Sequence, residues 1–167
     1  MWLGLGTNLG DRAANLASAL TALAGILDIE KLSAVYETQP FGYADQPVFW
    51  NMALRGLTRL SPGELLTAIK RLEPVLGRTA SFHMGPRAID IDILLYDDVQ
   101  ISTASLTVPH PGLLERAFVL RPLLDLDSDL RDPVTGARLA HCPALDNAPG
   151  ILRIGSAEEM LPPGTEY

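Results

Sequence analysis

Two aspartates stand two residues apart in the segment GPRAIDID, residues 85–92. Apolar residues at every second position predict a strand over Ala88–Tyr96, on which Asp90 and Asp92 point to the same face with Cα atoms about 6.6 Å apart. Neighbouring carboxylates repel each other, and a hard cation such as Mg²⁺ removes that repulsion when it binds. A solvated acidic strand face is the alternative, and the spacing alone leaves both interpretations open.

Basic residues lie on both sides of these aspartates in the sequence. Arg78 and Arg87 flank the loop that leads into the strand, while His110 and Arg116 follow it. Paired carboxylates combined with several arginines are typical of a site for a metal-bound polyphosphate. Each arginine taken singly also fits an exposed position, and His110, which stands between two prolines, also fits a structural role.

A second group combines aromatic and amide side chains. On a strand predicted over Val48–Thr58, Phe49 and Asn51 share the face opposite to that of Trp50, and the loop Thr38–Gly42 precedes them. An aromatic ring beside a carboxamide suits a flat heterocycle with ring nitrogens, which would be stacked and hydrogen-bonded. An ordinary half-exposed strand is the alternative.

The glycines near the N-terminus do not form a known nucleotide-binding motif. Leu9 occupies the position of the third glycine in the pattern G-x-G-x-x-G that begins at Gly4, and the chain contains no Gly-Lys-Ser/Thr sequence. These observations exclude a P-loop. We interpret Gly4, Gly6 and Gly10 as parts of a tight turn between a strand and a helix.

The elements that must position these residues follow the order strand, helix, strand, strand, helix, strand. This order predicts an α+β fold, a ferredoxin-like split β-α-β sandwich with a mainly antiparallel sheet and both helices packed on one side of it. A further helix around 113–124 belongs to a C-terminal extension. We expect one domain over 1–154 and a flexible tail over 155–167. The predicted elements are strands at 2–5, 29–38, 48–58 and 88–96 and helices capped by Asp11 and Ser61.

Composition limits the possible functions. The chain has 167 residues, of which 47% are apolar, and a net charge of −7. This acidity argues against nucleic acid and membrane surfaces as partners. Cys142 is the single cysteine, which excludes an internal disulfide, and no apolar run reaches the roughly 20 residues of a membrane span. We expect a cytoplasmic protein, and a monomer because no predicted strand is long, flat and apolar.

The sequence resembles the 6-hydroxymethyl-7,8-dihydropterin pyrophosphokinase family from Trp2 to about Gly136. Five motifs carry the resemblance, and the third is highly specific for the family: Leu5–Asp11, Thr38–Asn51, Gly85–Asp92, Thr107–Pro111 and Arg116–Leu120. The resemblance implies transfer of pyrophosphate from ATP to the hydroxymethyl group of the dihydropterin, with release of AMP, in folate biosynthesis. It also implies two Mg²⁺ ions.

The resemblance assigns roles to individual residues. Asp90 and Asp92 would bind the metal and, with Arg78 and Arg87, act in catalysis. Contacts to ATP are implied for Lys70, Glu73, Arg78, Arg87, Ile93, Thr107, His110 and Arg116. Contacts to the pterin are implied for Thr38, Phe41, Gly42, Phe49, Asn51, Asp90 and Phe118. Mobile loops are implied at 10–15, 44–47 and 79–84, and Met84 stands where members of the family usually carry an aromatic residue.

Elementary chemistry is consistent with such a transfer. The attacking group is an alcohol of the substrate, and no Ser-His or Cys-His pair is evident, so covalent catalysis is not expected. Positioning and charge neutralisation then remain as the means of catalysis. The rival hypotheses are a non-catalytic ferredoxin-like module that senses a nucleotide and, less favoured, a Mg²⁺-dependent phosphohydrolase. AMP formed only when the pterin is present would distinguish the enzyme from both.

Overall fold

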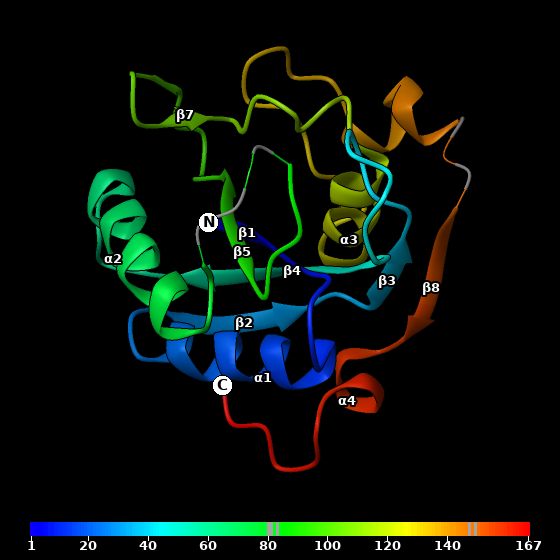
Figure 1. Ribbon diagram of the computed structural model, residues 1–167. Coiled ribbons are helices and arrows are strands. Elements are labelled where there is room, and N and C mark those ends of the chain that lie inside the picture. The colour runs from blue at the N-terminus through cyan, green and yellow to red at the C-terminus, as the bar shows by residue number, and fades with distance from the viewer. Residues whose placement is uncertain (80–81, 83, 147, 149) are drawn as a thin grey trace.

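A computed structural model describes residues 1–167 except 80, 81, 83, 147 and 149 (Figure 1). Its central sheet consists of β1 (Trp2–Thr7), β2 (Asp28–Leu32), β3 (Val35–Thr38), β4 (Phe49–Leu57), β5 (Asp90–Leu95) and β8 (Ile151–Gly155). The strand order is β5-β1-β4-β3-β8, with β2 also paired to β4, and every pairing is antiparallel. The predicted α+β ferredoxin-like fold is therefore confirmed.

Helices α1 (Arg12–Ala24) and α2 (Pro62–Val75) pack on one face of the sheet. The Asp11 carboxylate accepts a hydrogen bond from Ala14 N at the start of α1, and Ser61 and Glu64 form the predicted capping box of α2. Leucines at three- and four-residue spacing then form the apolar stripe that enters the core. Among the described residues, no helix is long and apolar enough to cross a membrane.

Helix α3 (Ala117–Leu126) covers the opposite face of the sheet, a position that the sequence analysis did not assign. Its Leu120 and Leu123 form a second apolar cluster with Leu94 of β5. The helix begins at Ala117 because the preceding residues 111–115 form turns, and Arg116 is its N-cap. In Figure 1, α1 and α3 lie on opposite sides of β4. The sheet is thus covered on both faces.

Two strand predictions need correction. The single strand predicted over 29–38 is divided into β2 and β3, because Ser33 Oγ accepts a hydrogen bond from Ala53 N at 2.8 Å and donates one to Ala34 O. In β5, Ile91 and Ile93 face α1 and α2 as predicted, but Leu95 belongs to the second cluster. The pairing of β5 with β1 shifts register near Trp2, which changes the face that Leu95 presents.

The C-terminal extension completes the sheet. Strand β8 pairs with β3, and the short helix α4 (Ala157–Met160), capped by Ser156, buries Ala157 and Leu161 in the first core. The first part of the expected tail is therefore packed, and mainly exposed chain begins only at residue 162. The other elements are β6 (Ile101–Ser102), β7 (Thr107–Val108) and the 3₁₀ turns η1 (Leu139–His141) and η2 (Pro143–Leu145).

One polar contact links β3 to α3. The Tyr36 hydroxyl lies 3.0 Å from both carboxylate oxygens of Asp125, and Asp125 Oδ2 also accepts a hydrogen bond from Ala34 N at 3.1 Å. Burial and then the hydrogen bond to Asp125 raise the pKa of Tyr36 to about 12. Since the unfolded value is about 10, this hydroxyl stabilises the fold fully below pH 10.

We expect Tyr36→Phe to lower the free energy of unfolding by about 1.5 kcal/mol at pH 7, because it removes a hydrogen bond to a carboxylate. The deficit should shrink between pH 10 and pH 12, as wild-type Tyr36 ionises and its contribution is lost. Urea unfolding at pH 7 and pH 11 measures both values, with Tyr167→Phe at the exposed C-terminus as control. Equal stability of wild type and variant at pH 7 would contradict the role given to this contact.

Candidate active site

Two glycines of β1 leave the middle of the sheet open on the α3 side. In the antiparallel register, Gly4 lies between Ala53 of β4 and Asp92 of β5, and Gly6 lies between Asn51 and Asp90. A Cβ at Gly6 would come within 2.9 Å of Asn51 Oδ1. Both glycines belong to β1 and line a pocket, so their interpretation as turn residues was wrong. Because they are two residues apart, they share one face of a strand, and this spacing is the sequence signal that could have indicated an open site on that face.

This pocket, termed the central pocket, collects most of the residues that the two sequence groups contain. Asn51 Nδ2 donates a hydrogen bond to Thr38 Oγ1 at 2.7 Å, and the rings of Phe41 and Phe118 lie 6.1 Å apart. Phe49 and Asn51 face it as predicted. Its lining includes Gly4, Gly6, Thr38, Phe41, Phe49, Asn51, Met84, Arg87, Asp90, Asp92, Arg116 and Phe118. Six of the seven residues expected to contact a pterin therefore meet here; the seventh, Gly42, lies against the side chain of Met84.

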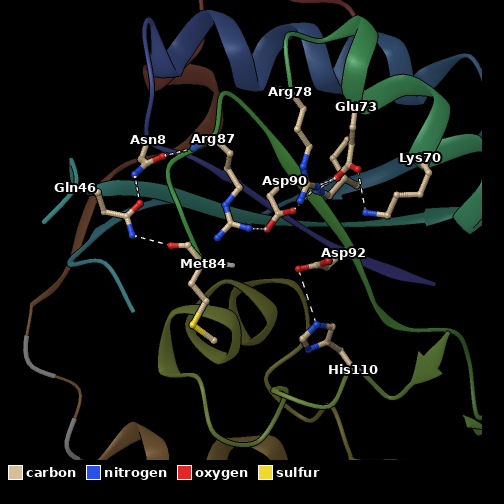
Figure 2. A network of polar contacts seen from close by, with 11 residues as sticks. Asn8, Gln46, Lys70, Glu73, Arg78, Met84, Arg87, Asp90, Asp92 and His110 are labelled. Atoms are coloured by element: carbon tan, nitrogen blue, oxygen red, sulfur yellow. Dashed lines mark hydrogen bonds and ion pairs between the residues drawn. The ribbon is translucent and has the colours of Figure 1, made fainter. Parts of the chain in front are cut away.

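Asp90 stands between two arginines (Figure 2). Its Oδ1 lies 2.6 Å from Arg78 NH1, and its Oδ2 lies 2.9 Å from Arg87 NH1. The Arg87 guanidinium also lies 5.6 Å from the ring centroid of Phe49. Charge-assisted contacts of this kind hold both guanidinium groups beside the central pocket. The two arginines on either side of the 79–86 loop thus converge on one carboxylate.

Glu73 is a buried acid on α2 that organises the neighbouring cations. It is 2% exposed and accepts hydrogen bonds from Lys70 Nζ at 2.9 Å, from Ile91 N at 3.1 Å and from Arg78 NH1. Figure 2 shows Lys70, Glu73 and Arg78 in a row that leads to Asp90. The carboxylate therefore connects α2 to β5 and orients Arg78. Both of its oxygens are occupied by groups of the protein.

Asp92 has a different environment, in which no lysine or arginine of the described residues forms an ion pair with it. The nearest partner is His110 Nε2, 3.9 Å from Asp92 Oδ2. Partial burial and then the adjacent Asp90 carboxylate raise the pKa of Asp92 to about 6. A half-buried carboxylate without a strong ion pair suits the binding of a cation.

His110 is held as a neutral donor. Burial and then the charge of Arg116 lower its pKa, so the ring is neutral at pH 7. Its Nδ1 accepts a hydrogen bond from Gly112 N at 3.0 Å, which leaves the proton on Nε2, the atom that faces Asp92. The ring can therefore donate a hydrogen bond to an anion bound at Asp92.

The donor set at Asp90 and Asp92 fits Mg²⁺. Within the described part of the chain, no group of three or more histidine, cysteine, aspartate or glutamate side chains is arranged to hold a metal ion. Mg²⁺ binds readily through one or two carboxylates, with waters and phosphate oxygens as its remaining ligands. Two carboxylates on one strand face meet that requirement, whereas a zinc site would need further nitrogen or sulfur ligands.

The remaining residues implied for ATP binding are distributed unevenly. Arg116 lines the central pocket, with its guanidinium 5.5 Å from the ring centroid of Phe41. Thr107 is half-buried in β7 outside the pocket lining. Ile93 does not face the pocket: its side chain is 4% exposed in the first core, which leaves only its backbone for any ligand. Strand parity explains this orientation, since Ile93 alternates with Asp92; a contact of its backbone with ATP stays a prediction.

Of the three loops implied to be mobile, two are tied to the fold. Asp11 caps α1, residues 12–15 belong to that helix, and Gln46 in the loop 44–47 is hydrogen-bonded to Asn8. In the loop 79–84, positions 80, 81 and 83 lie outside the described residues.

Comparison with known proteins agrees with this geometry. The profile of the 7,8-dihydro-6-hydroxymethylpterin-pyrophosphokinase (HPPK) family matches residues 2–128. The chain is 46% identical to the 2-amino-4-hydroxy-6-hydroxymethyldihydropteridine pyrophosphokinase of Aquifex aeolicus, over 80% of this chain and 84% of that protein. Its identity to the corresponding Bacillus subtilis protein is 42%, over 81% and 83% of the two chains.

A longer relative and a solved structure show the same domain within larger proteins. The folic acid synthesis protein fol1 of Schizosaccharomyces pombe is 45% identical over 89% of this chain, which spans only 20% of that protein. Wild-type HPPK-DHPS of Plasmodium falciparum, solved with pterin and p-hydroxybenzoate, matches with a TM-score of 0.67 at 18% identity, over 83% of this chain and 40% of that one. That structure supports the fold. The extent of the profile match and the identity to the two bacterial enzymes establish that this chain belongs to the HPPK family.

Proposed function

We propose that the residues around Asp90 and Asp92 carry out the reaction of this family, pyrophosphoryl transfer from ATP to the hydroxymethyl group of 6-hydroxymethyl-7,8-dihydropterin. The observation that carries the proposal is the central pocket itself. An aromatic and amide subsite at Phe49 and Asn51 adjoins an acidic and arginine-rich subsite across a floor of glycines. A flat heterocycle and a polyphosphate can therefore lie side by side. The curated relatives, which are named pyrophosphokinases, favour this enzyme over a nucleotide sensor.

We assign the binding of two Mg²⁺ ions to Asp90 and Asp92. When bound, Mg²⁺ neutralises charge on the triphosphate and makes its phosphorus a better electrophile. Asp92 supports the assignment because the part of the chain that the structure describes gives it no ion pair closer than the 3.9 Å approach of His110. Asp90 keeps Arg78 and Arg87 close to the same place, so the cationic side chains and the metal would act on one set of oxygens.

The side chains of the pocket supply orientation and charge. The substrate hydroxyl oxygen forms a bond to the β-phosphorus of ATP and loses its proton to water, the bond from that phosphorus to the α,β-bridging oxygen breaks, and AMP leaves. Arg78, Arg87 and Arg116 would stabilise the negative charge that moves onto the phosphate oxygens. Neutral His110 would donate its Nε2 proton as a hydrogen bond to a phosphate oxygen.

Recognition of the pterin is assigned to the other end of the pocket. Phe49 and Phe118 supply apolar faces for the ring, and Asn51 supplies a carboxamide that is already oriented by Thr38. An oriented donor and acceptor pair lowers the entropy cost of binding a heterocycle with matching edges. Placement of the two substrates in reacting geometry would then provide much of the rate increase.

We also propose that the chain acts as a monomer in the cytoplasm. Its only cysteine, Cys142, forms no disulfide, and the edge strand β8 spans just five residues. Light scattering should give a mass near 18.0 kDa. A mass twice that value at micromolar concentration would contradict the monomer.

We expect Asp92→Asn to lower AMP production at least about a thousandfold, because several kcal/mol of metal-assisted charge stabilisation are lost. The fold should persist, since the ion pair of the Asp92 carboxylate within the described residues is the 3.9 Å approach of His110, and asparagine keeps the size of the side chain. The assay follows AMP and ADP from ATP, Mg²⁺ and the dihydropterin, with circular dichroism as the test of folding. Asp98→Asn, the same change at an exposed turn three residues beyond β5, should keep full activity. Near-normal AMP production by Asp92→Asn would defeat the metal assignment.

We expect Glu73→Gln to reduce turnover by roughly 10- to 100-fold, the usual range for a residue that orients a catalytic group through a hydrogen bond. The glutamine keeps an acceptor for Ile91 N but removes the charge that holds Arg78 and Lys70. Steady-state kinetics against both substrates provide the measurement. Glu30→Gln, which removes the charge of an exposed ion pair with Arg55, serves as the control. Activity of Glu73→Gln within twofold of wild type would show that Arg78 does not depend on Glu73.

A further inference from the structure

On the basis of the function given above, we propose that the carboxamides of Asn8 and Gln46 are positioning residues for the pterin end of the central pocket. Together they connect three segments that are remote in the sequence: the end of β1, the loop 43–47 and residues 84–87 just before β5. Figure 2 shows Gln46 between Asn8 and Met84. Neither carboxamide lines the pocket.

Gln46 uses both ends of its carboxamide. Its Oε1 accepts a hydrogen bond from Asn8 Nδ2 at 3.0 Å, and its Nε2 donates to Tyr43 O at 2.7 Å and to Met84 O at 2.9 Å. It is half-buried in a segment, residues 41–47, that is otherwise exposed. These hydrogen bonds attach the loop to the pocket wall, beside the ring contacts of Phe41 with Phe118 and of Tyr43 with Phe82.

Asn8 links Gln46 to the buried part of the fold. It is 2% exposed, and besides Gln46 its Nδ2 donates to Pro47 O at 3.0 Å. Its Oδ1 accepts from Arg87 N at 2.8 Å, while its own N donates to Arg87 O at 3.1 Å. The backbone of Arg87 is thereby held on both sides, and its guanidinium reaches Asp90. A buried carboxamide with all of these groups paired resists reorientation.

Met84 is the group that this network holds at the pocket. Its φ is 59°, a left-handed conformation that costs energy for a residue with a side chain and persists only where neighbouring contacts support it. The hydrogen bond from Gln46 to Met84 O is one such contact, and the other is the packing of its sulfur against Gly42, where a Cβ would collide. Met84 therefore forms part of the lining of the central pocket, together with Phe49 and Asn51.

The polyphosphate end shares one element with these contacts, the backbone of Arg87, which bonds to Asn8 and not to Gln46. The hydrogen bonds of Lys70, Glu73 and His110 do not involve Asn8, Gln46 or Met84. The ion pair described for Asp92 is with His110. Loss of the Gln46 carboxamide should consequently displace the Met84 wall and leave the arginine and carboxylate groups in place. The expected signature is weaker use of the pterin at unchanged affinity for ATP.

The test measures steady-state kinetics of AMP formation and, separately, binding of MgATP to the free enzyme by calorimetry. For Gln46→Ala we expect the KM for the dihydropterin to rise at least tenfold, kcat to fall less than threefold, and the Kd for MgATP to stay within twofold of wild type. Gln100→Ala removes another hydrogen bond from a side-chain amide to a backbone carbonyl, to Pro133 O at 2.8 Å, at a site outside the pocket. It should leave all three constants unchanged.

A double-mutant cycle adds a second test. Asn8→Asp keeps the acceptor for Arg87 N but removes the donor to Gln46 Oε1, so the Gln46 Nε2 should turn toward the new carboxylate and away from Met84. We expect Asn8→Asp to reproduce the rise in pterin KM, and the double variant with Gln46→Ala to show no more than twofold additional change. Non-additivity of this kind would support one shared network.

Two results would overturn the positioning role. One is a pterin KM for Gln46→Ala within twofold of wild type in an active enzyme. The other is an equal loss of pterin and MgATP binding together with a lowered Tm, which would indicate a general structural role. Absence of AMP formation by the wild type would instead refute the proposed function, and the positioning proposal with it.

Discussion

The antiparallel register of β1 between β4 and β5 is the constraint on which the site depends. It sets Gly4 and Gly6 level with Asp92 and Asp90 on one side and with Ala53 and Asn51 on the other. A shift of one residue would turn both aspartates into the core and both isoleucines of β5 into the pocket. The apolar face that packs on α1 and α2 therefore determines the register, and the register in turn brings the polar side chains together.

Charge balance explains how an acidic chain can accommodate a polyphosphate. The net charge of −7 belongs to the whole sequence, but the surroundings of Asp90 combine three carboxylates with Lys70 and three arginines. Asp90 and Glu73 hold Arg78 where a flexible side chain would otherwise sample many positions, which lowers the entropy cost of binding. Asp92 forms no ion pair with a lysine or arginine outside the five undescribed positions. The arrangement is organised in advance for a ligand that brings metal charge with it.

Periodicity and spacing were sufficient to predict much of this structure. Alternation in the strands, the capping box at Ser61 and the leucine stripe after Asp11 gave the core elements and the fold class. The pair Asp90 and Asp92, together with the flanking arginines, located the polar end of the pocket, and the parity of Phe49 and Asn51 located the other end. The family resemblance added the roles of individual residues, which the alternation of side chains along a strand does not give.

The structural features that the sequence did not predict depend on tertiary contacts. The face covered by α3, the pairing of β8 with β3 and the burial of Glu73 all result from packing between segments far apart in the chain. Parity places the Ile93 side chain in the core, so the contact with ATP that the resemblance implies would have to use its backbone. A motif pattern in the sequence does not reveal the role of Gly4 and Gly6. That role is to leave space beside the side chains of their neighbours on β4 and β5.

The two ends of the central pocket are anchored to different hydrophobic cores. Glu73 ties the polyphosphate end to α2 and so to the first core, while Phe118 belongs to α3, whose Leu120 and Leu123 pack in the second. Sequence drift in the second core therefore acts directly on Phe118, and it reaches the aspartates of β5 only through Leu94 and Leu95. Evolution can retune selectivity for the heterocycle by repacking beneath α3, provided that these two leucines and Arg116 at the start of the helix keep their positions.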